Sequence, residues 1–238
     1  MEDRQGQWSL SVVFPAYNEA SNIAQSVVWA RRVLKPVCSD FEILIVDDGS
    51  VDQTGEIGER LAEEDERVRV LHHPQNRGYG AALRSGIASS KKQLILIVGA
   101  DLQFDLDEIP RFLGMAEAYD IVVGNRVRRR DPFMRKLNAW GWNSLGWLLF
   151  GVGLPDINCG FKLFHRNVFE RMTLQATGAM IDTEILVQAR RAGFRVMAIP
   201  VSHFPRPAGK STGASPMVIV RAFKELVQLY RKLHGRIF

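Results

Sequence analysis

The stretch Leu94–Gln103, LILIVGADLQ, decides the fold class. Five aliphatic residues are followed directly by two small residues, a carboxylate, a leucine and an amide. Such a run is typical of a strand buried on both faces, which is the kind of strand that parallel sheets contain. Polar residues that follow a buried strand lie at the edge of its sheet. The pattern therefore predicts a buried strand with Asp101 at its tip.

The segments on either side continue this pattern. We expect strands at 10–14, 41–46, 68–71 and 121–123, separated by helices at about 22–34, 52–64, up to about 88, and 105–119. Strands that alternate with helices indicate βαβ units. After Arg126 the alternation weakens, and we expect helix over 134–150, strand over 161–164, helix over 182–192, strand over 194–199 and helix over 216–233. The predicted fold class is α/β, with a mostly parallel central sheet flanked by helices.

Length and composition favour one domain. The chain has 238 residues, of which 46% are apolar and 24% charged, as in globular proteins. We expect one domain over 1–215, with the amphipathic helix of 216–238 packed on it or lying at a membrane surface. The apolar segment Leu145–Leu154 is shorter than the ~20 residues that a membrane-spanning helix needs. Met1–Trp8 is polar and charged, so we expect a cytoplasmic protein.

The cysteine and charge content narrow the function classes. Cys38 and Cys159 are too few for a disulfide framework, and we expect free thiols. The net charge is +5. Basic residues cluster at Arg126, Arg128, Arg129, Arg130, Arg135 and Lys136, and again at Arg221, Lys224, Arg231, Lys232 and Arg236. Such clusters either bind anionic partners or form a solvated face. A nucleic-acid partner is disfavoured, because no groove-binding or single-strand motif accompanies the basic residues.

Polar residues at successive strand ends indicate a ligand site. They are Asp47, Asp48, Asp101, Gln103, Asn125 and Arg126. In an open α/β sheet, ligands bind beyond the carboxyl ends of the strands. One acid at a strand end is usually a turn former or a helix cap, but several at one edge favour a site.

Two competing motifs are weak. Gly78–Leu83 begins like a dinucleotide-binding fingerprint, but its third small position is Leu83 and it does not follow the first strand. His72 and His73 are adjacent on an expected strand, so their side chains would point to opposite faces. They do not have the spacing of a two-histidine metal site.

Five motifs together resemble a known family. They are Phe14–Glu19 (FPAYNE), Val46–Asp52 (VDDGSVD), Asn76–Gly78 (NRG), Ala100–Asp105 (ADLQFD) and Asp156–Lys162 (DINCGFK). In this order they resemble family 2 of the nucleotide-sugar glycosyltransferases, and within it the dolichol- or polyprenyl-phosphate mannose (hexose) synthases. The resemblance covers about residues 9–215. It implies a GT-A fold, a divalent metal, and an inverting transfer of a hexose from a GDP- or UDP-sugar to a polyprenyl phosphate.

The resemblance also implies roles for individual residues. The donor-nucleotide site would comprise Pro15, Tyr17, Glu19, Asp47, Asp48, Ala100 and Asp101, although Pro15 and Tyr17 could simply shape the turn. Asp101 and Gln103 would hold Mg²⁺ or Mn²⁺, which favour oxygen ligands. The family has an aspartate where this chain has Gly99. Three outcomes stay open: an enzyme with weakened metal affinity, a site completed by Asp105 or another acid, or a protein that binds donor without turnover.

The acceptor implies a need for cations. A polyprenyl phosphate is mostly anionic at neutral pH, with a second pKa of about 6, so it needs no strong general base. Cations would instead hold its phosphate and the diphosphate, and the candidates are Arg126, Arg135, Arg206 and Lys210. Asp101, Asp156, Asp182 and Arg126 are the candidates for a catalytic role. Asp156 and Asp182 could each be a cap instead, Asp182 more readily because it opens an expected helix.

The acceptor's lipid tail requires an apolar surface. Trp140, Trp142 and Trp147, after a basic cluster, could form a peripheral membrane contact or could pack on the sheet. Transfer to a saccharide hydroxyl is the alternative function, and an essential Asp182 would favour it. A metal-impaired donor-binding protein is the second alternative. The sugar, the nucleobase and the oligomeric state do not follow from the residues.

Overall fold

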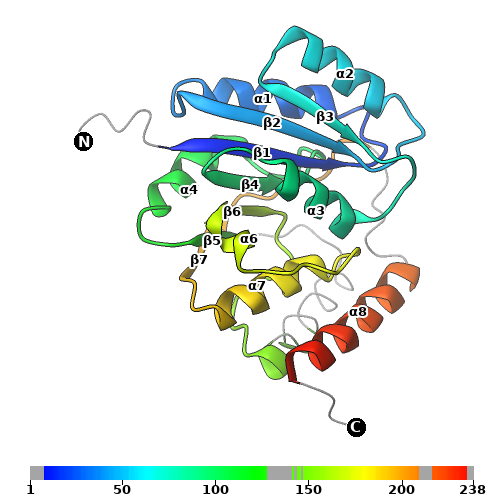
Figure 1. The fold of residues 1–238 in the computed structure, drawn as a ribbon. Coiled ribbons are helices and arrows are strands. Elements are labelled where there is room, and N and C mark those ends of the chain that lie inside the picture. The colour runs from blue at the N-terminus through cyan, green and yellow to red at the C-terminus, as the bar shows by residue number, and fades with distance from the viewer. Residues whose placement is uncertain (1–7, 128–140, 142–143, 146, 209–215, 235–238) are drawn as a thin grey trace.

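The computed structural model describes residues 8–127, 141, 144–145, 147–208 and 216–234. Figure 1 shows a central sheet with helices on both of its faces and the last helix at one end of the molecule. The strands are β1 (Ser9–Ala16), β2 (Asp40–Asp47), β3 (Val68–His72), β4 (Leu94–Val98), β5 (Ile121–Arg126), β6 (Phe161–His165) and β7 (Val196–Val201).

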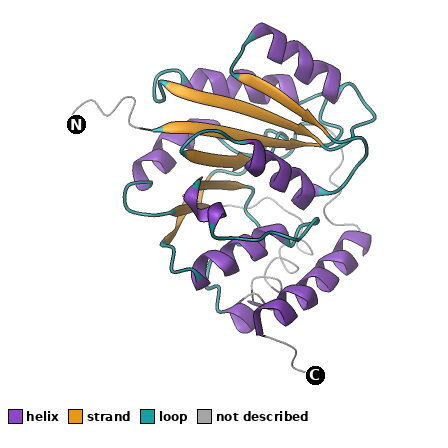
Figure 2. Ribbon diagram, in the orientation of Figure 1, coloured by secondary structure: helices purple, strands orange, loops and turns teal. Residues whose placement is uncertain are grey.

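The helices alternate with these strands over the first half of the chain. They are α1 (Ile23–Leu34), α2 (Thr54–Glu64), α3 (Tyr79–Ser89), the 3₁₀ helix η1 (Leu106–Glu108), α4 (Ile109–Met115), α6 (Asn167–Glu170), α7 (Ile181–Arg191) and α8 (Pro216–His234). Figure 2 shows the same alternation by element type. The predicted fold class is confirmed.

The strands lie in the order β3-β2-β1-β4-β6-β5-β7. The neighbours β3, β2, β1 and β4 are parallel, as are β5 and β7. The strand β6 runs antiparallel to β4 and β5, between which it lies. The carboxyl ends of the six parallel strands and the amino end of β6 therefore meet at one edge, which we call the carboxyl edge.

The stretch that decided the fold class is the central strand of this sheet. All five residues of β4 are buried, and β4 pairs with β1 on one side and β6 on the other. Helices cover both faces of this strand, so its aliphatic side chains are removed from water on both sides. This burial of apolar surface stabilises the parallel arrangement. The predicted strand with Asp101 just beyond its end is confirmed.

The helix α3 packs closely on β1 and β2. A Cβ atom on its Gly86 would lie 2.4 Å from Cγ1 of Val13 and 3.1 Å from Cγ2 of Val46. Glycine therefore lets the helix backbone approach the sheet. At its first turn, the backbone N–H of Gly80 donates to the carbonyl oxygen of Thr177 at 2.9 Å, so the segment 175–178 crosses the beginning of this helix.

The last helix docks on that same segment. The Oε1 atom of Glu225 in α8 accepts from the backbone N–H of Thr177 at 2.9 Å and of Gly178 at 3.0 Å. Its buried face includes Ala222, Leu226 and Leu229. Within the described part of the chain, no helix has the length and apolar character to span a membrane.

Two sequence predictions need comment. The short helix α6 was not predicted, because four residues are too few for a helical periodicity. Most of the helix expected over 134–150 lies outside the described residues, although 147–150 is helical. Cys38 and Cys159 are free and buried, as predicted.

Candidate active site

An arginine between two acids lies at the centre of the carboxyl edge. Arg206 donates from Nη2 to the carboxylate of Glu19, and its Nη1 lies 3.9 Å from Oδ2 of Asp101. The side chains of Arg206 and Asp101 are 18% and 21% exposed, so the cluster remains open to solvent. Burial raises the pKa of Glu19, against the opposing effects of Asn22 and Arg206. One cation thus balances acids that follow two different strands.

A late loop brings Arg206 to this edge. Phe204 donates its backbone N–H to the carbonyl oxygen of Gln103 at 2.8 Å, and Nε2 of Gln103 donates to the carbonyl oxygen of Phe204 at 3.1 Å. His203 forms a β-bridge with Phe104, and their rings lie 5.3 Å apart. Beyond this reciprocal pairing, Nε of Arg206 donates to its own loop at Ala208. The position of this loop is therefore set by its hydrogen bonds to the turn after β4.

The turn after β4 has one carboxylate and space for another. Asp101 accepts from the backbone N–H of Gln103 at 3.3 Å, and the intervening Leu102 has a φ of +57°. A Cβ atom at Gly99 would lie 3.1 Å from Oδ1 and 3.6 Å from Cγ of Asp101, and no other residue of the described part of the chain, apart from its two neighbours, comes within 4 Å. The missing aspartate of the family pattern would therefore face Asp101.

The fit of these residues to a divalent metal is partial. In the described ranges, no three His, Cys, Asp or Glu side chains come together as a metal-binding group. Asp101 supplies a carboxylate, and Gln103 an amide whose nitrogen is already used by Phe204. Mg²⁺ commonly binds through one or two carboxylates together with substrate phosphates and water. The pair suits an ion completed by a diphosphate, and is too small to hold one alone.

The adjacent aspartates after β2 hold neighbouring loops. Asp47 accepts from the backbone N–H of Ser50 at 3.0 Å and lies 3.0 Å from Nδ1 of His72. Asp48 lies 2.6 Å from Nδ1 of His73. It also accepts from the backbone N–H groups of the following loop, Arg77 at 3.0 Å and Gly78 at 2.8 Å. The two histidines, which did not suit a metal site, are the partners of the paired acids.

The Asp47–His72 contact gives the stability a pH dependence. Hydrogen bonds to the carboxylates of Glu59 and then Asp47 raise the pKa of His72 above its usual 6.5, although partial burial opposes them. A histidine whose folded pKa is raised stabilises fully below its unfolded pKa, and this contribution is lost as the pH rises through the folded value. We expect the free energy of unfolding to fall over this window, by no more than ~1 kcal/mol because the ring is 43% exposed.

Urea unfolding between about pH 5.5 and 8.5 measures this effect, with His72→Gln as the comparison. The variant should lack the decline that wild type shows. A matched control is His165→Gln, whose ring lies against a backbone carbonyl of Ala116 rather than a carboxylate. If the free energy of unfolding changed with pH in the same way for wild type and His72→Gln, the ion pairs of His72 would not contribute to stability.

Two predicted site residues pair with each other. Arg126, at the end of β5, donates from Nε to Oδ2 of Asp156 at 2.6 Å and from Nη2 to Oδ1 at 2.8 Å. Their side chains are 12% and 4% exposed. A bidentate pair of this kind fixes both groups and offsets their charges. Arg126 therefore neutralises Asp156 within the chain.

Asp182 belongs to a second buried pair, which the sequence did not reveal. Lys162 on β6 donates from Nζ to Oδ1 of Asp182 at 2.7 Å and to the carbonyl oxygen of Cys159. Burial raises the pKa of Asp182, and Lys162 opposes the rise. Tyr79 is near this group: burial, and next the charge of Asp182, raise its pKa well above the usual value.

The remaining predicted residues fall into two groups. Pro15 lies within β1, Tyr17 directly follows it, and Ala100 accepts at its carbonyl oxygen from the hydroxyl of Ser26 at 3.0 Å. All three lie at the carboxyl edge. Arg135 and Lys210 lie outside the described residues.

Comparison with known proteins identifies the family. The model of glycosyl transferase family 2 matches residues 11–173. The chain belongs to this family, as the five motifs predicted. It is a glycosyltransferase-family chain with the polar residues of its motifs at the carboxyl edge of the sheet.

Named relatives resemble the chain over most of its length. It is 35% identical over 207 residues to the glycosyltransferase AglD of Haloferax volcanii, covering 83% of this chain and 33% of the relative. It is 29% identical over 226 residues to the polyprenol monophosphomannose synthase of Mycolicibacterium smegmatis, covering 90% and 84%. The dolichyl-phosphate beta-glucosyltransferase ALG5A of Trichomonas vaginalis is 34% identical over 212 residues, covering 81% and 64%. The chain thus spans one third of the first relative and nearly two thirds of the third.

A solved structure supports the fold. The glucosyl-3-phosphoglycerate synthase of Mycobacterium tuberculosis, crystallised with Mn²⁺, UDP-glucose and phosphoglyceric acid, matches with a TM-score of 0.68 and 20% identity. The match covers 92% of this chain and 79% of that chain. At this identity the likeness shows a shared GT-A fold.

Proposed function

We propose that the chain transfers a hexose from a nucleotide-diphosphate sugar to a polyprenyl phosphate, with inversion at the anomeric carbon. The observation that carries the proposal is the cluster of Arg206, Glu19 and Asp101 at the carboxyl edge. Glu19 and Asp101 belong to two of the five motifs, and Arg206 comes from the late loop after β7. Relatives that bear the names of polyprenol- and dolichyl-phosphate sugar transferases support this acceptor class.

In this proposal the donor lies across the ends of β1, β2 and β4. Pro15, Tyr17, Glu19 and Ala100 would line the nucleotide site, with Asp101 nearest the diphosphate. Asp47 and Asp48 would contribute by holding the loops after β2 and β3, since their oxygens already accept from protein groups. The donor is a GDP- or UDP-sugar.

Asp101 and Gln103 would hold a divalent ion, Mg²⁺ or Mn²⁺, together with the donor diphosphate. Such an ion supplies charge neutralisation of the leaving diphosphate. The Mn²⁺ in a solved structure of the same fold supports this cofactor class. Arg206, which lies beside Asp101, would add a positive charge of the protein next to the diphosphate.

The acceptor phosphate brings its own nucleophile. One of its anionic oxygens forms the new bond to the anomeric carbon while the bond to the nucleotide diphosphate breaks, so no proton must be removed. Arg206 would orient this phosphate, with Arg135 and Lys210 as further cations. Arg126 would act through Asp156, because its guanidinium is already paired.

A peripheral membrane contact on the cytoplasmic side would bring the lipid to this site. Trp147 and Leu148 are 63% and 72% exposed. On α8, Phe223 and Val227 are about half exposed beside the exposed Lys224. Apolar and basic side chains together suit an anionic lipid surface. In this arrangement α8 would be an amphipathic helix added to the domain of residues 1–215.

Two alternative functions have specific tests. Transfer to a saccharide hydroxyl needs a base, and the buried Asp182 is the candidate, so loss of turnover in Asp182→Asn with a saccharide acceptor would favour it. A donor-binding protein without turnover is suggested by Gly99. Calorimetric donor binding with no release of nucleotide diphosphate would select that alternative.

The deciding experiment uses the purified chain with a panel of nucleotide sugars, Mg²⁺ or Mn²⁺, and a short-chain polyprenyl phosphate. We expect release of nucleotide diphosphate that requires the lipid phosphate, and one donor that raises the melting temperature. Release with a saccharide but not with the lipid phosphate would replace the proposed acceptor. No release with any combination would reject the transferase.

Gly99→Asp is expected to tighten metal binding about 10- to 100-fold, because it adds a carboxylate opposite Asp101. Titration of Mn²⁺ in the presence of nucleotide diphosphate measures the change. Gly99→Asn is the matched control, since it has the same size without the charge. Equal Mn²⁺ affinities for wild type and Gly99→Asp would show that position 99 does not face the ion.

A further inference from the structure

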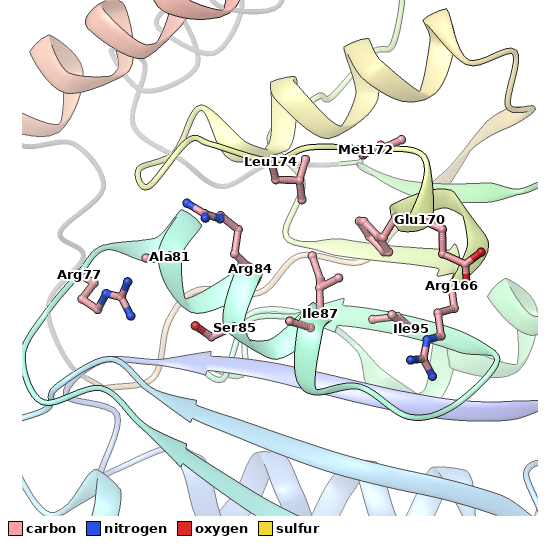
Figure 3. Close-up of a pocket in the computed structure, with 12 residues that line it drawn as sticks. Arg77, Ala81, Arg84, Ser85, Ile87, Ile95, Arg166, Glu170, Met172 and Leu174 are labelled. Carbon is pink, nitrogen blue, oxygen red and sulfur yellow. The ribbon is translucent and has the colours of Figure 1, made fainter.

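A groove of about 520 Å³ lies between α3 and the segment from α6 to residue 174, above the first half of β4. Figure 3 shows its lining, with arginine side chains at both ends and apolar side chains between them. The segment 175–178 crosses the first turn of α3 through the bonds from Gly80 and Ala81 to Thr177. The groove is therefore a place distinct from the cluster around Arg206.

The described lining of this groove carries an excess of positive charge. Arg77, Arg84 and Arg166 line it, and none of the three has an ion pair with a carboxylate there. Arg84 makes only a 3.3 Å bond to the carbonyl oxygen of Gln175. Glu170 is the only acid in the lining. Unpaired guanidinium groups around a hollow favour an anion, and a phosphate in particular.

The floor between these arginines is apolar. It includes Ile87, Ile95, Phe169, Met172 and Leu174. All five belong to the hydrophobic core or pack against it, and Ile95 is part of β4 itself. A hydrated inorganic anion would gain nothing from this floor, whereas a hydrocarbon would remove apolar surface from water at roughly 25 cal/mol per Å².

We propose that the groove binds a phosphate monoester carried on a hydrocarbon. The phosphate contacts Arg77 and Arg84 at one end of the groove, and the hydrocarbon lies on the aliphatic and aromatic floor. This ligand is a lipid phosphate bound away from the catalytic edge, so the inference goes beyond the proposed reaction and does not depend on turnover.

A reporter inside the groove separates this site from any acceptor site at the carboxyl edge. Ala88 lines the groove and is exposed, while Cys38 and Cys159 are buried with raised thiol pKa values. A trifluoromethyl tag on Ala88→Cys therefore labels one position selectively. The matched control carries the tag at Glu63→Cys, exposed on α2.

The titration uses the full chain and farnesyl phosphate below its micelle concentration, followed by ¹⁹F NMR. We expect a saturable shift at position 88 and none at position 63. Arg77→Gln with Arg84→Gln should weaken it about 10²- to 10⁴-fold, because each charged hydrogen bond accounts for about 10- to 100-fold in affinity. Arg60→Gln, an exposed arginine on α2, should leave it unchanged.

Three further probes test the ligand chemistry. Farnesol, inorganic phosphate and uridine monophosphate should each bind at least about tenfold more weakly than farnesyl phosphate. Inorganic phosphate as strong as farnesyl phosphate would make this a plain anion site and overturn the proposal. So would an absent shift at position 88, or one that survives loss of both arginines. Because no turnover is measured, failure here leaves the transferase proposal standing, and the reverse also holds.

Discussion

Asp101→Asn is expected to lower turnover about 10²- to 10³-fold, the usual cost of removing one electrostatic group from a reaction centre. Asp101 is the carboxylate at the tip of the central strand, 3.9 Å from Arg206. The amide keeps the size of the side chain and loses the charge that would bind an ion. The fold should be unaffected, since the residue is at the solvent-open edge. Release of nucleotide diphosphate at saturating donor measures the effect.

Asp105→Asn is the matched control for this prediction. Asp105 lies in the same turn and caps η1 by accepting from the backbone N–H of Asp107, so its replacement should cost at most ~1 kcal/mol of stability. Its turnover should stay within about threefold of wild type, unless Asp105 substitutes for the missing acid at position 99. If Asp101→Asn retained wild-type turnover and metal dependence, the ion would have to be held elsewhere.

The fold was largely predictable because its strands are simple. Strands β2 and β4 are built around aliphatic runs that polar residues follow, and such runs have few alternatives to burial inside a sheet. The place of β6 was not predictable. Five residues cannot reveal that a strand runs antiparallel between β4 and β5, because that choice depends on the long connection before it.

The gathering of polar residues at the carboxyl edge could be predicted from the sequence, whereas the pairings among them could not. Asp101 and Arg206 were both predicted site residues, yet their proximity depends on the bridge between Phe104 and His203. The partners of the paired aspartates, His72 and His73, had been considered only as metal ligands. Side-chain pairing between distant segments leaves no periodic signal in one sequence. The buried pair of Lys162 and Asp182 left one signal in the sequence, a lysine inside an otherwise apolar strand.

Lys162→Met is expected to lower the free energy of unfolding by about 3–5 kcal/mol, because it leaves a buried carboxylate without its partner. Lys162 is 1% exposed and Asp182 7% exposed. Burial already raises the pKa of Asp182, and removal of the lysine should raise it further. A raised folded pKa destabilises the ionised form, so the loss should grow as the pH rises. Urea unfolding at about pH 5 and pH 8 measures both effects.

The double variant Lys162→Met with Asp182→Asn separates this charge effect from a packing effect. It removes the charge from both partners, so it should recover most of the lost stability. Lys92→Met is the exposed control: its partner Asp40 is 58% exposed, and the loss should be under ~1 kcal/mol. If the double variant stays as unstable as Lys162→Met at both pH values, the lysine acts through packing and its bond to Cys159. In that case Lys162 does not stabilise the fold by neutralising Asp182.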